Sequence, residues 1–176
     1  MKPINNWNDV KPSGDFTPLE PGGYVLKILS ATNVPDKEYL EILYDIAEGP
    51  EKGRYGGDWG KEHPYSHRLI RSYKEKAVGM LKAFINAIEA SNAGYTWAWE
   101  EKTLKGKLFG AVIGLEEYMN DFGEIKNRLT VRSIKTADDI RQGDFTVPDV
   151  KRYKPKDDAP LEAPPAGFSA DDDIPF

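Results

Sequence analysis

The last six residues of the chain form a short peptide that has the chemistry of a protein ligand. The chain ends in three carboxylates, two apolar side chains flanking a proline, and a terminal carboxylate: Asp171, Asp172, Asp173, Ile174, Pro175 and Phe176. Such a segment buries too little apolar surface to offset the entropy of ordering it, so it cannot fold alone. As a ligand it offers two apolar anchors on a restricted backbone and a charge that steers it toward a basic surface. We therefore predict a docking site for partner proteins here. The alternative is an acidic terminus that only improves solubility.

Cations alternate along a segment near residue 130 in a pattern suited to phosphate. Residues 124–134 read as a strand, and the alternation places Lys126, Arg128, Thr130 and Arg132 on one face. Three cations on one strand face resemble a track for phosphate groups. The alternative is a solvated face of a sheet.

A glycine-rich loop is expected over residues 48–60, which contain five glycines. It carries a cation and two rings, Arg54, Tyr55 and Trp59, which could close over a strand of bases. Alternatively, Trp59 caps the hydrophobic core. The loop lacks the Gly-Lys-Ser/Thr spacing of a nucleotide phosphate loop.

The remaining candidates for contact with nucleic acid are cations and rings on or near expected strands. They are Lys27, Arg68, Arg71, Tyr39, Tyr73, Trp97 and Trp99. Arg68 and Arg71 should lie on opposite faces of their strand, or one of them near an edge. Trp97 and Trp99 suit core packing and base stacking equally well.

The sequence gives little evidence of a metal site or a cofactor site. His63 and His67 are four residues apart, but Pro64 interrupts any helix that would bring them together, and no carboxylate triad accompanies them. The chain has no cysteine, so it has neither disulfides nor thiolate ligands. We expect no metal site, no cofactor and no catalytic residue, although the abundance of acidic residues leaves a metal-dependent nuclease as an alternative.

The net charge of −5 describes the end of the chain more than its body. Of 29 acidic residues, six lie after residue 156, where there is no basic residue, so 23 acidic and 24 basic residues remain before that point. A nearly neutral body needs a locally basic groove to bind phosphate. The chain has no stretch long and apolar enough to span a bilayer and no apolar leader at its start, so we expect a soluble, cytoplasmic protein.

The elements that must position these residues are five strands and one helix. Apolar alternation and turn residues predict strands over 24–32, 38–47, 66–73, 104–118 and 124–134, the fourth strongly bent by its glycines. An apolar stripe at helical spacing predicts a helix over 74–91, made of Ala77, Met80, Leu81, Phe84, Ile85 and Ile88. No further element is expected after Thr136.

Three regions follow from this pattern. Residues 1–20 form an irregular arm, and residues 21–150 form the folded body. Residues 151–176 form a tail. Its first part belongs to a basic stretch, residues 147–156, that could stay on the body or contact nucleic acid, and residues 157–170 are rich in proline, alanine and acids and are expected to form a disordered linker. The order of three strands, a helix and two strands matches the OB-fold, a mainly β, five-stranded Greek-key barrel that binds single strands.

The terminal six residues resemble the acidic tip that ends bacterial and phage single-stranded DNA-binding proteins. That resemblance implies docking of replication, repair and recombination enzymes on residues 171–176. The body, over roughly residues 20–135, is similar to a family of phage-encoded OB-fold proteins. Three stretches carry this similarity: Pro-Gly-Gly-Tyr-Val-Leu-Lys-Ile from residue 21, Ile-Ala-Glu-Gly-Pro-Glu-Lys-Gly-Arg-Tyr from residue 46, and Lys-Gly-Lys-Leu-Phe-Gly-Ala-Val-Ile from residue 105. The body departs from the bacterial pattern, so the tetramer of that group is not carried over, and strand edges favour a homodimer.

Together, these features predict a protein that coats single-stranded DNA without reading its sequence, in phage DNA replication, recombination and repair. It would act in the cytoplasm of the bacterial host. Two alternatives remain at this point. One is an adaptor that captures host enzymes through residues 171–176 without binding DNA, and the other is a strand-annealing accessory of recombination.

Overall fold

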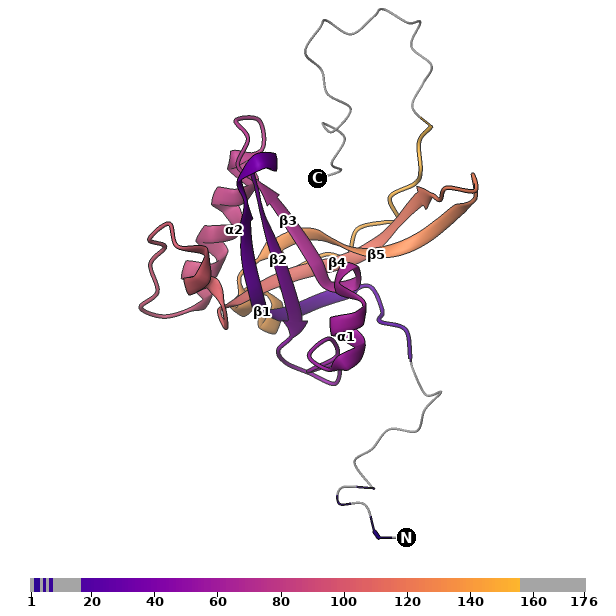
Figure 1. Cartoon of the computed structure of the whole chain (residues 1–176), viewed down its shortest axis with the longest axis horizontal. Coiled ribbons are helices and arrows are strands. Elements are labelled where there is room, and N and C mark those ends of the chain that lie inside the picture. Colours follow the sequence, from indigo (N-terminus) through magenta and orange to yellow (C-terminus); the bar gives the residue numbers. More distant parts are fainter. Residues whose placement is uncertain (1, 4, 6, 8–16, 156–176) are drawn as a thin grey trace, which may run out of the picture.

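The computed structural model describes residues 2, 3, 5, 7 and 17–155 (Figure 1). The predicted tip at residues 171–176 and the linker before it therefore lie outside the described residues, as does most of the predicted N-terminal arm. Among the described residues, no helix has the length and apolar character needed to cross a membrane.

One antiparallel sheet of five strands forms the body, in the order β3-β2-β1-β4-β5 (Figure 1). The strands are β1 (Gly22–Val34), β2 (Tyr39–Ile46), β3 (Arg68–Ser72), β4 (Leu108–Met119) and β5 (Ile125–Lys135). The helices are α1 (Asp58–Glu62), α2 (Val78–Ser91) and α3 (Ala137–Gln142), with 3-10 turns η2 (Pro35–Lys37), η3 (Pro64–His67) and η4 (Glu101–Leu104). The prediction of a mainly β chain with its longest helix between the third and fourth strands is confirmed.

The main helix begins four residues later than predicted. The backbone N–H of Tyr73 still donates to Glu38 O at 2.9 Å, so strand-like pairing continues past the end of β3. The hydroxyl of Ser72 then accepts from the N–H of Lys74 at 3.2 Å and starts a turn. Residues 74–77 form this turn, closed by Ala77 N donating to Lys74 O at 2.8 Å, and the regular helix follows it.

Two short helices were not predicted. α1 lies inside the glycine-rich segment that was expected to be a loop. α3 follows β5 and has clear end signals: Thr136 and Asp139 form a reciprocal capping box, and Gly143 ends the helix with a φ of 74°. The sequence pattern that marks α3 was present, but it covers only a few residues. Gly110 on β4 makes room for it, because a Cβ there would lie 2.3 Å from Thr136 O.

The core lies between the inner face of the sheet and α2. Phe84, Ile85, Ala87 and Ile88 of α2 are buried, and the ring of Phe84 meets that of Phe109 edge to face at 5.1 Å. The predicted apolar stripe is thus confirmed for its central residues. Met80 is the exception, being 42% exposed.

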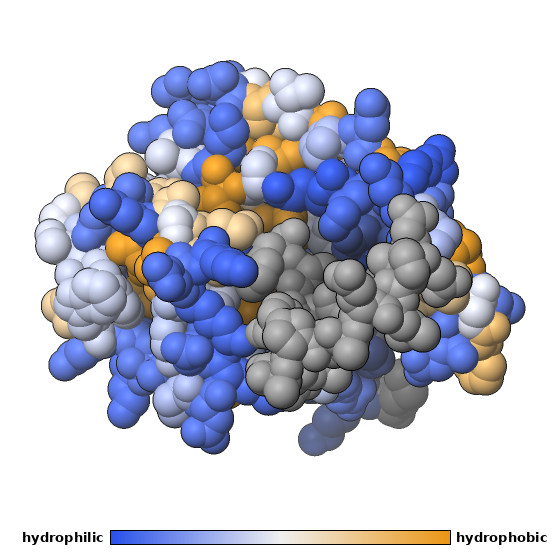
Figure 2. Space-filling model, turned by 90° about the horizontal axis from the view of Figure 1, so that it is seen from above, coloured by the Kyte–Doolittle hydropathy of each residue, from blue (hydrophilic) through white to orange (hydrophobic). Residues whose placement is uncertain are grey.

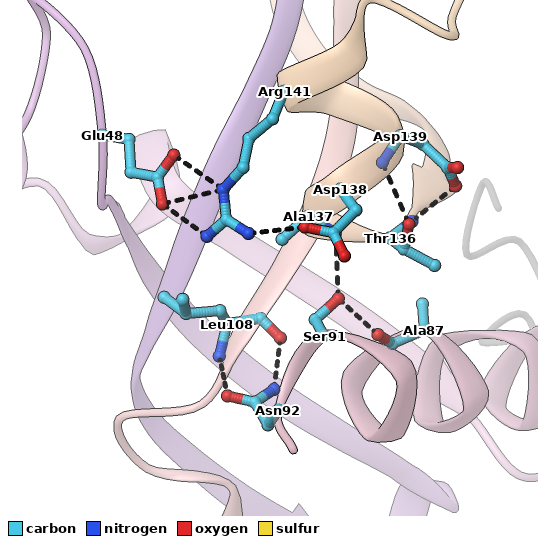
Figure 3. Close-up of polar contacts among 10 residues, drawn as sticks. All are labelled: Glu48, Ala87, Ser91, Asn92, Leu108, Thr136, Ala137, Asp138, Asp139 and Arg141. Carbon is cyan, nitrogen blue, oxygen red and sulfur yellow. Dashed lines mark hydrogen bonds and ion pairs between the residues drawn. The ribbon is translucent and has the colours of Figure 1, made fainter.

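Polar contacts at the end of α2 fix this helix to β4 and α3 (Figure 3). The side chain of Asn92 donates to Leu108 O at 2.8 Å and accepts from Leu108 N at 3.0 Å. The Ser91 hydroxyl accepts from Ala137 N at 2.9 Å. On the other side of α3, the guanidinium of Arg141 is paired with both Glu48 and Asp138. These contacts hold the two helices at the end of the sheet.

Candidate nucleic-acid interface

The two edge strands of the sheet face each other across a groove of about 520 Å³. β3 and β5 are not hydrogen-bonded neighbours, yet both line this groove, together with Tyr65, residues Met80 and Ala83 of α2, and Lys151. The sheet is therefore curled but not closed. The sequence could not predict this open seam between β3 and β5, because the width of the seam depends on how strongly the whole sheet coils.

Cations dominate the lining of the groove. Five line it, namely Arg68, Arg71, Arg128, Arg132 and Lys151. Glu116 is the one carboxylate among the described lining residues. A cleft lined by one sign of charge concentrates its field and attracts ligands of the opposite sign.

Arg71 is the most unusual of these cations, because it is only 8% exposed. It lies opposite Leu40 in the β2–β3 register, on the inner face of the sheet, with its guanidinium carbon 5.7 Å from the centroid of the Phe84 ring. Its Nη1 donates to Ile70 O at 3.0 Å, whereas its buried Nε has no acceptor. Burial lowers the pKa of Arg71 to about 10, so the group still carries its charge at neutral pH.

Glu116 partly neutralises the opposite wall. Its Oε2 accepts from Arg128 Nε at 3.1 Å and from Arg128 Nη2 at 3.0 Å, and its Oε1 accepts from Lys151 Nζ at 2.6 Å. Burial alone would raise the pKa of Glu116, but the hydrogen bonds from Lys151 and Arg128 outweigh it, so the pKa is lowered. Glu116 is therefore an ionised counterion inside the groove.

The two remaining arginines are held differently. Arg132 Nη1 donates to two backbone carbonyls, Leu115 O at 3.0 Å and Asp149 O at 3.3 Å, neither of which cancels its charge. Arg68 Nη1 lies 3.2 Å from Glu41 Oε2, and its guanidinium carbon lies 4.5 Å from the centre of the Tyr65 ring. Arg68 and Arg71 therefore lie on opposite faces of β3, which agrees with one of the two interpretations of the sequence.

The basic segment after residue 146 packs against the body and does not extend away from it. Lys151 forms a parallel bridge with Glu116, with Lys151 N donating to Leu115 O at 3.0 Å and Glu117 N donating to Lys151 O at 2.8 Å. Arg152 is paired with Glu117. This segment therefore delivers Lys151 to the groove.

Several predicted contact residues lie elsewhere. The side chain of Lys27 is exposed on β1, and Tyr73 donates its hydroxyl to Asn33 Oδ1 at 3.0 Å. Lys126 lies farther out on the β4–β5 hairpin, 3.4 Å from Glu124. Tyr39 is half-buried on β2. None of these four lines the groove.

The tryptophan pair after α2 is also outside the groove. The rings of Trp97 and Trp99 lie 6.2 Å apart and tilted, with Trp97 against the core. Trp99 is 82% exposed and has a left-handed backbone with a φ of 63°. The two residues are not in a strand, and of the two roles that the sequence left open Trp97 takes core packing.

The candidates of the glycine-rich segment form part of a column of rings. Tyr55 is buried and stacks on His67 at 5.0 Å and 12°. Trp59 stacks on Tyr55 at 6.2 Å and on His63 at 4.6 Å, and remains 40% exposed. Arg54 donates to Glu51 and to Thr17 O. This column supports the base of β3, and only Trp59 and His63 offer an accessible ring.

Sequence reasoning missed two polar residues of the groove, Tyr65 and Glu116, and named Lys151 only as part of a basic stretch that could contact nucleic acid. Tyr65 is 77% exposed and lies in η3, directly before β3. Its position after Pro64, directly before a strand with two arginines, was an available signal. Glu116 could not be found in this way, because its role depends on partners 12 and 35 residues away.

Comparison with known proteins gives no match: neither a family model nor a curated protein matches this chain. Within the part of the chain that the structure describes, no three histidine or acidic side chains lie close enough to hold a metal ion.

Proposed function

We propose that this chain is a sequence-independent single-stranded DNA-binding protein that binds DNA in the groove between β3 and β5. The observation that carries the proposal is the convergence of five cations against one carboxylate in a groove with two open strand edges. Lysine and arginine pair with phosphates and release counterions. This contribution to the binding affinity does not depend on base sequence.

We further propose that the body is an OB-type barrel left open at the β3–β5 seam. Two features support this: the strand order with β3 and β5 at the edges, and the position of α2 between β3 and β4. The OB-fold is itself a partly open, five-stranded Greek-key barrel. The groove would then be the gap in the barrel wall.

The groove favours contacts to phosphate over stacking. Tyr65 is the one strongly exposed ring among its described lining residues, while Tyr44 is buried. We therefore expect most of the affinity to come from charge, with a smaller term from stacking, which is worth roughly 1–3 kcal/mol per base.

In this proposal the protein coats and protects single strands during phage DNA replication, recombination and repair, in the host cytoplasm and without enzymatic activity. Residues 171–176 would recruit partner enzymes. A pull-down with a peptide of these residues, compared with a peptide lacking Phe176, tests this part.

Two copies would pair through the β4–β5 hairpin, which extends away from the other strands (Figure 1). Met119, Phe122 and Ile125 are exposed on it, and apolar atoms show at that end of the molecule in Figure 2. Equilibrium sedimentation of the protein and of a Phe122→Ser variant tests the pairing, which predicts a dimer that the variant weakens.

The test of DNA binding is fluorescence anisotropy of a labelled oligo(dT), at low and at high salt. A labelled oligonucleotide is preferable to tryptophan fluorescence, because none of the described lining residues is a tryptophan. Binding should weaken steeply with salt, with a slope lowered by about 0.7 in Arg132→Met. The matched control is Lys105→Met, at an exposed position outside the groove. If the wild-type protein binds no oligonucleotide at low salt, the proposal is wrong and the adaptor function takes its place.

A further inference from the structure

Arg71, a lining residue of the groove, carries an unsatisfied donor. Its Nη1 donates to Ile70 O, and its buried Nε has no acceptor among the described residues. Nε and Nη2 form one edge of the planar guanidinium, the edge that binds two acceptor atoms side by side. The residue is 8% exposed and lines the groove, so a group that enters the groove and reaches the guanidinium could satisfy this edge.

The surroundings of Arg71 indicate which charge a group bound to its guanidinium would carry. Arg71 lies against the Phe84 ring, and neighbouring lining residues include Leu69, Met80 and Ile134. In the described chain Arg71 has no carboxylate partner, and a buried cation without a counterion is costly. A neutral base edge would satisfy the donors but leave the charge uncompensated. An oxyanion does both, and its interaction is strengthened because water is excluded.

We infer that Arg71 is a receptor for one phosphodiester group, and that the DNA strand enters the groove with its backbone inward and its bases outward. This inference rests on the proposed function and specifies how the strand lies in the same groove. The phosphate would bridge Nε and Nη2 of Arg71, with Arg132 on the facing strand as a second cation. Bases would then reach only the rim, where Tyr65 is exposed.

This orientation explains why the groove would be indifferent to sequence. Phosphate contacts position a strand without reading it, whereas base contacts specify. A strand bound in the reverse orientation would depend on rings in the floor of the groove. The described floor offers the buried Tyr44 and the apolar side chains near Arg71, with no exposed ring among them.

The test compares three labelled oligonucleotides of equal length: oligo(dT), an abasic deoxyribose-phosphate strand, and a dT strand with neutral methylphosphonate linkages. The wild-type protein should bind the abasic strand within about fivefold of oligo(dT), because phosphate contacts supply most of the affinity. It should bind the methylphosphonate strand at least 100-fold more weakly. Arg71→Met should weaken binding of both charged strands about 10-fold to 100-fold. Arg71→Lys should not restore it, since an ammonium lacks the planar fork.

A measurement on the wild-type protein reports the contact itself and needs one variant only to assign the resonance. The Nε–H resonance of Arg71, assigned by its loss in Arg71→Lys, should move on addition of the abasic strand and not on addition of the methylphosphonate strand. The inference is overturned if oligo(dT) binds while the abasic strand binds over 100-fold more weakly, or if the resonance stays in place at saturation. Either result leaves DNA binding itself intact. Absence of any binding to oligo(dT) would instead refute the proposed function.

Discussion

Glu116 and Arg128 face each other across adjacent strands, with one carboxylate oxygen accepting from both Nε and Nη2 of the guanidinium. The other oxygen of Glu116 holds Lys151 at 2.6 Å. Two of the five cations in the groove are thus already paired with an internal anion. An entering phosphate must compete with this carboxylate for both of them.

The Glu116→Gln substitution should therefore increase affinity for single-stranded DNA. The amide keeps the shape of the side chain but leaves Arg128 and Lys151 without their counterion. We expect about a twofold to tenfold tighter Kd at low salt and a steeper dependence on salt. Anisotropy titrations with oligo(dT) at several salt concentrations measure both quantities.

Glu117→Gln is the matched control for this change. Glu117 is the next residue on β4 and pairs with Arg152, but it does not line the groove. Its neutralisation should leave the affinity within about twofold of the wild type. Equal effects of the two substitutions would show that net charge matters and that the groove does not.

His67 should make stability depend on pH in the mildly acidic range. Its ring is 2% exposed, stacks on Tyr55, and has a buried Nδ1 with no partner. Burial lowers the pKa of His67, although the nearby Asp45 carboxylate opposes the shift. The unfolded chain, with a histidine pKa near 6.5, therefore binds a proton more readily than the folded chain. Stability is complete above about pH 6.5 and falls as the pH drops below it.

Denaturant melts between pH 7.5 and pH 5 measure this loss. His67→Phe keeps an aromatic ring and cannot be protonated, so its stability should change less over this range. His63→Gln is the control, because His63 is exposed. A wild-type stability that stays flat down to pH 5 would contradict the assignment.

The order of elements could be predicted from sequence because it rests on local patterns. Alternation in β2 places Leu40, Ile42 and Tyr44 inside, and the helical repeat of α2 places Phe84 and Ile88 inside, as expected. The start of α2 depended on the hydrogen bond from Tyr73 N to Glu38 O, which joins residues far apart in the chain and is not revealed by a local pattern. The signals of α3 are local, but the helix is only six residues long.

The site was predictable for its cations and less so for its rings. Arg68, Arg71, Arg128 and Arg132 were selected because they are cations on strands, and all four line the groove. Lys27 and Lys126 were selected for the same reason and do not line it. Tyr55 was selected because it is an aromatic ring on an expected glycine-rich loop, but its ring is buried against His67. An aromatic side chain suits a core and a stacking surface equally, so its type alone does not decide between them.

We predict that Asn92 contributes more to stability than any other polar side chain at the end of the sheet where α2 and α3 pack. It is half-buried and satisfies both backbone groups of Leu108 (Figure 3). Its Nδ2 also donates to Ile88 O at 2.7 Å. Asn92→Ala leaves these groups without partners and should cost about 1–3 kcal/mol of the free energy of unfolding. Asn86→Ala, at an exposed position of α2, should change it by less than about 0.5 kcal/mol. Chemical denaturation measures both, and similar values for the two variants would show that the contacts to Leu108 are not stabilising.

Deletion of residues 157–176 should increase affinity for DNA at low salt. This segment holds six acidic residues and no basic residue, and it begins six residues after Lys151, which lines the groove. A tethered segment has a high effective concentration near its attachment point, so its carboxylates compete with phosphate for the same cations. We expect about a threefold to tenfold tighter Kd for oligo(dT) at low salt, and a difference that vanishes at high salt as the competing charges are screened. A variant with the six acids replaced by Asn and Gln should behave like the deletion, because it keeps the length of the segment and removes only its charge. Unchanged affinity of both variants at low salt would rule out this competition, and unchanged affinity of the charge variant alone would assign the effect to the bulk of the segment.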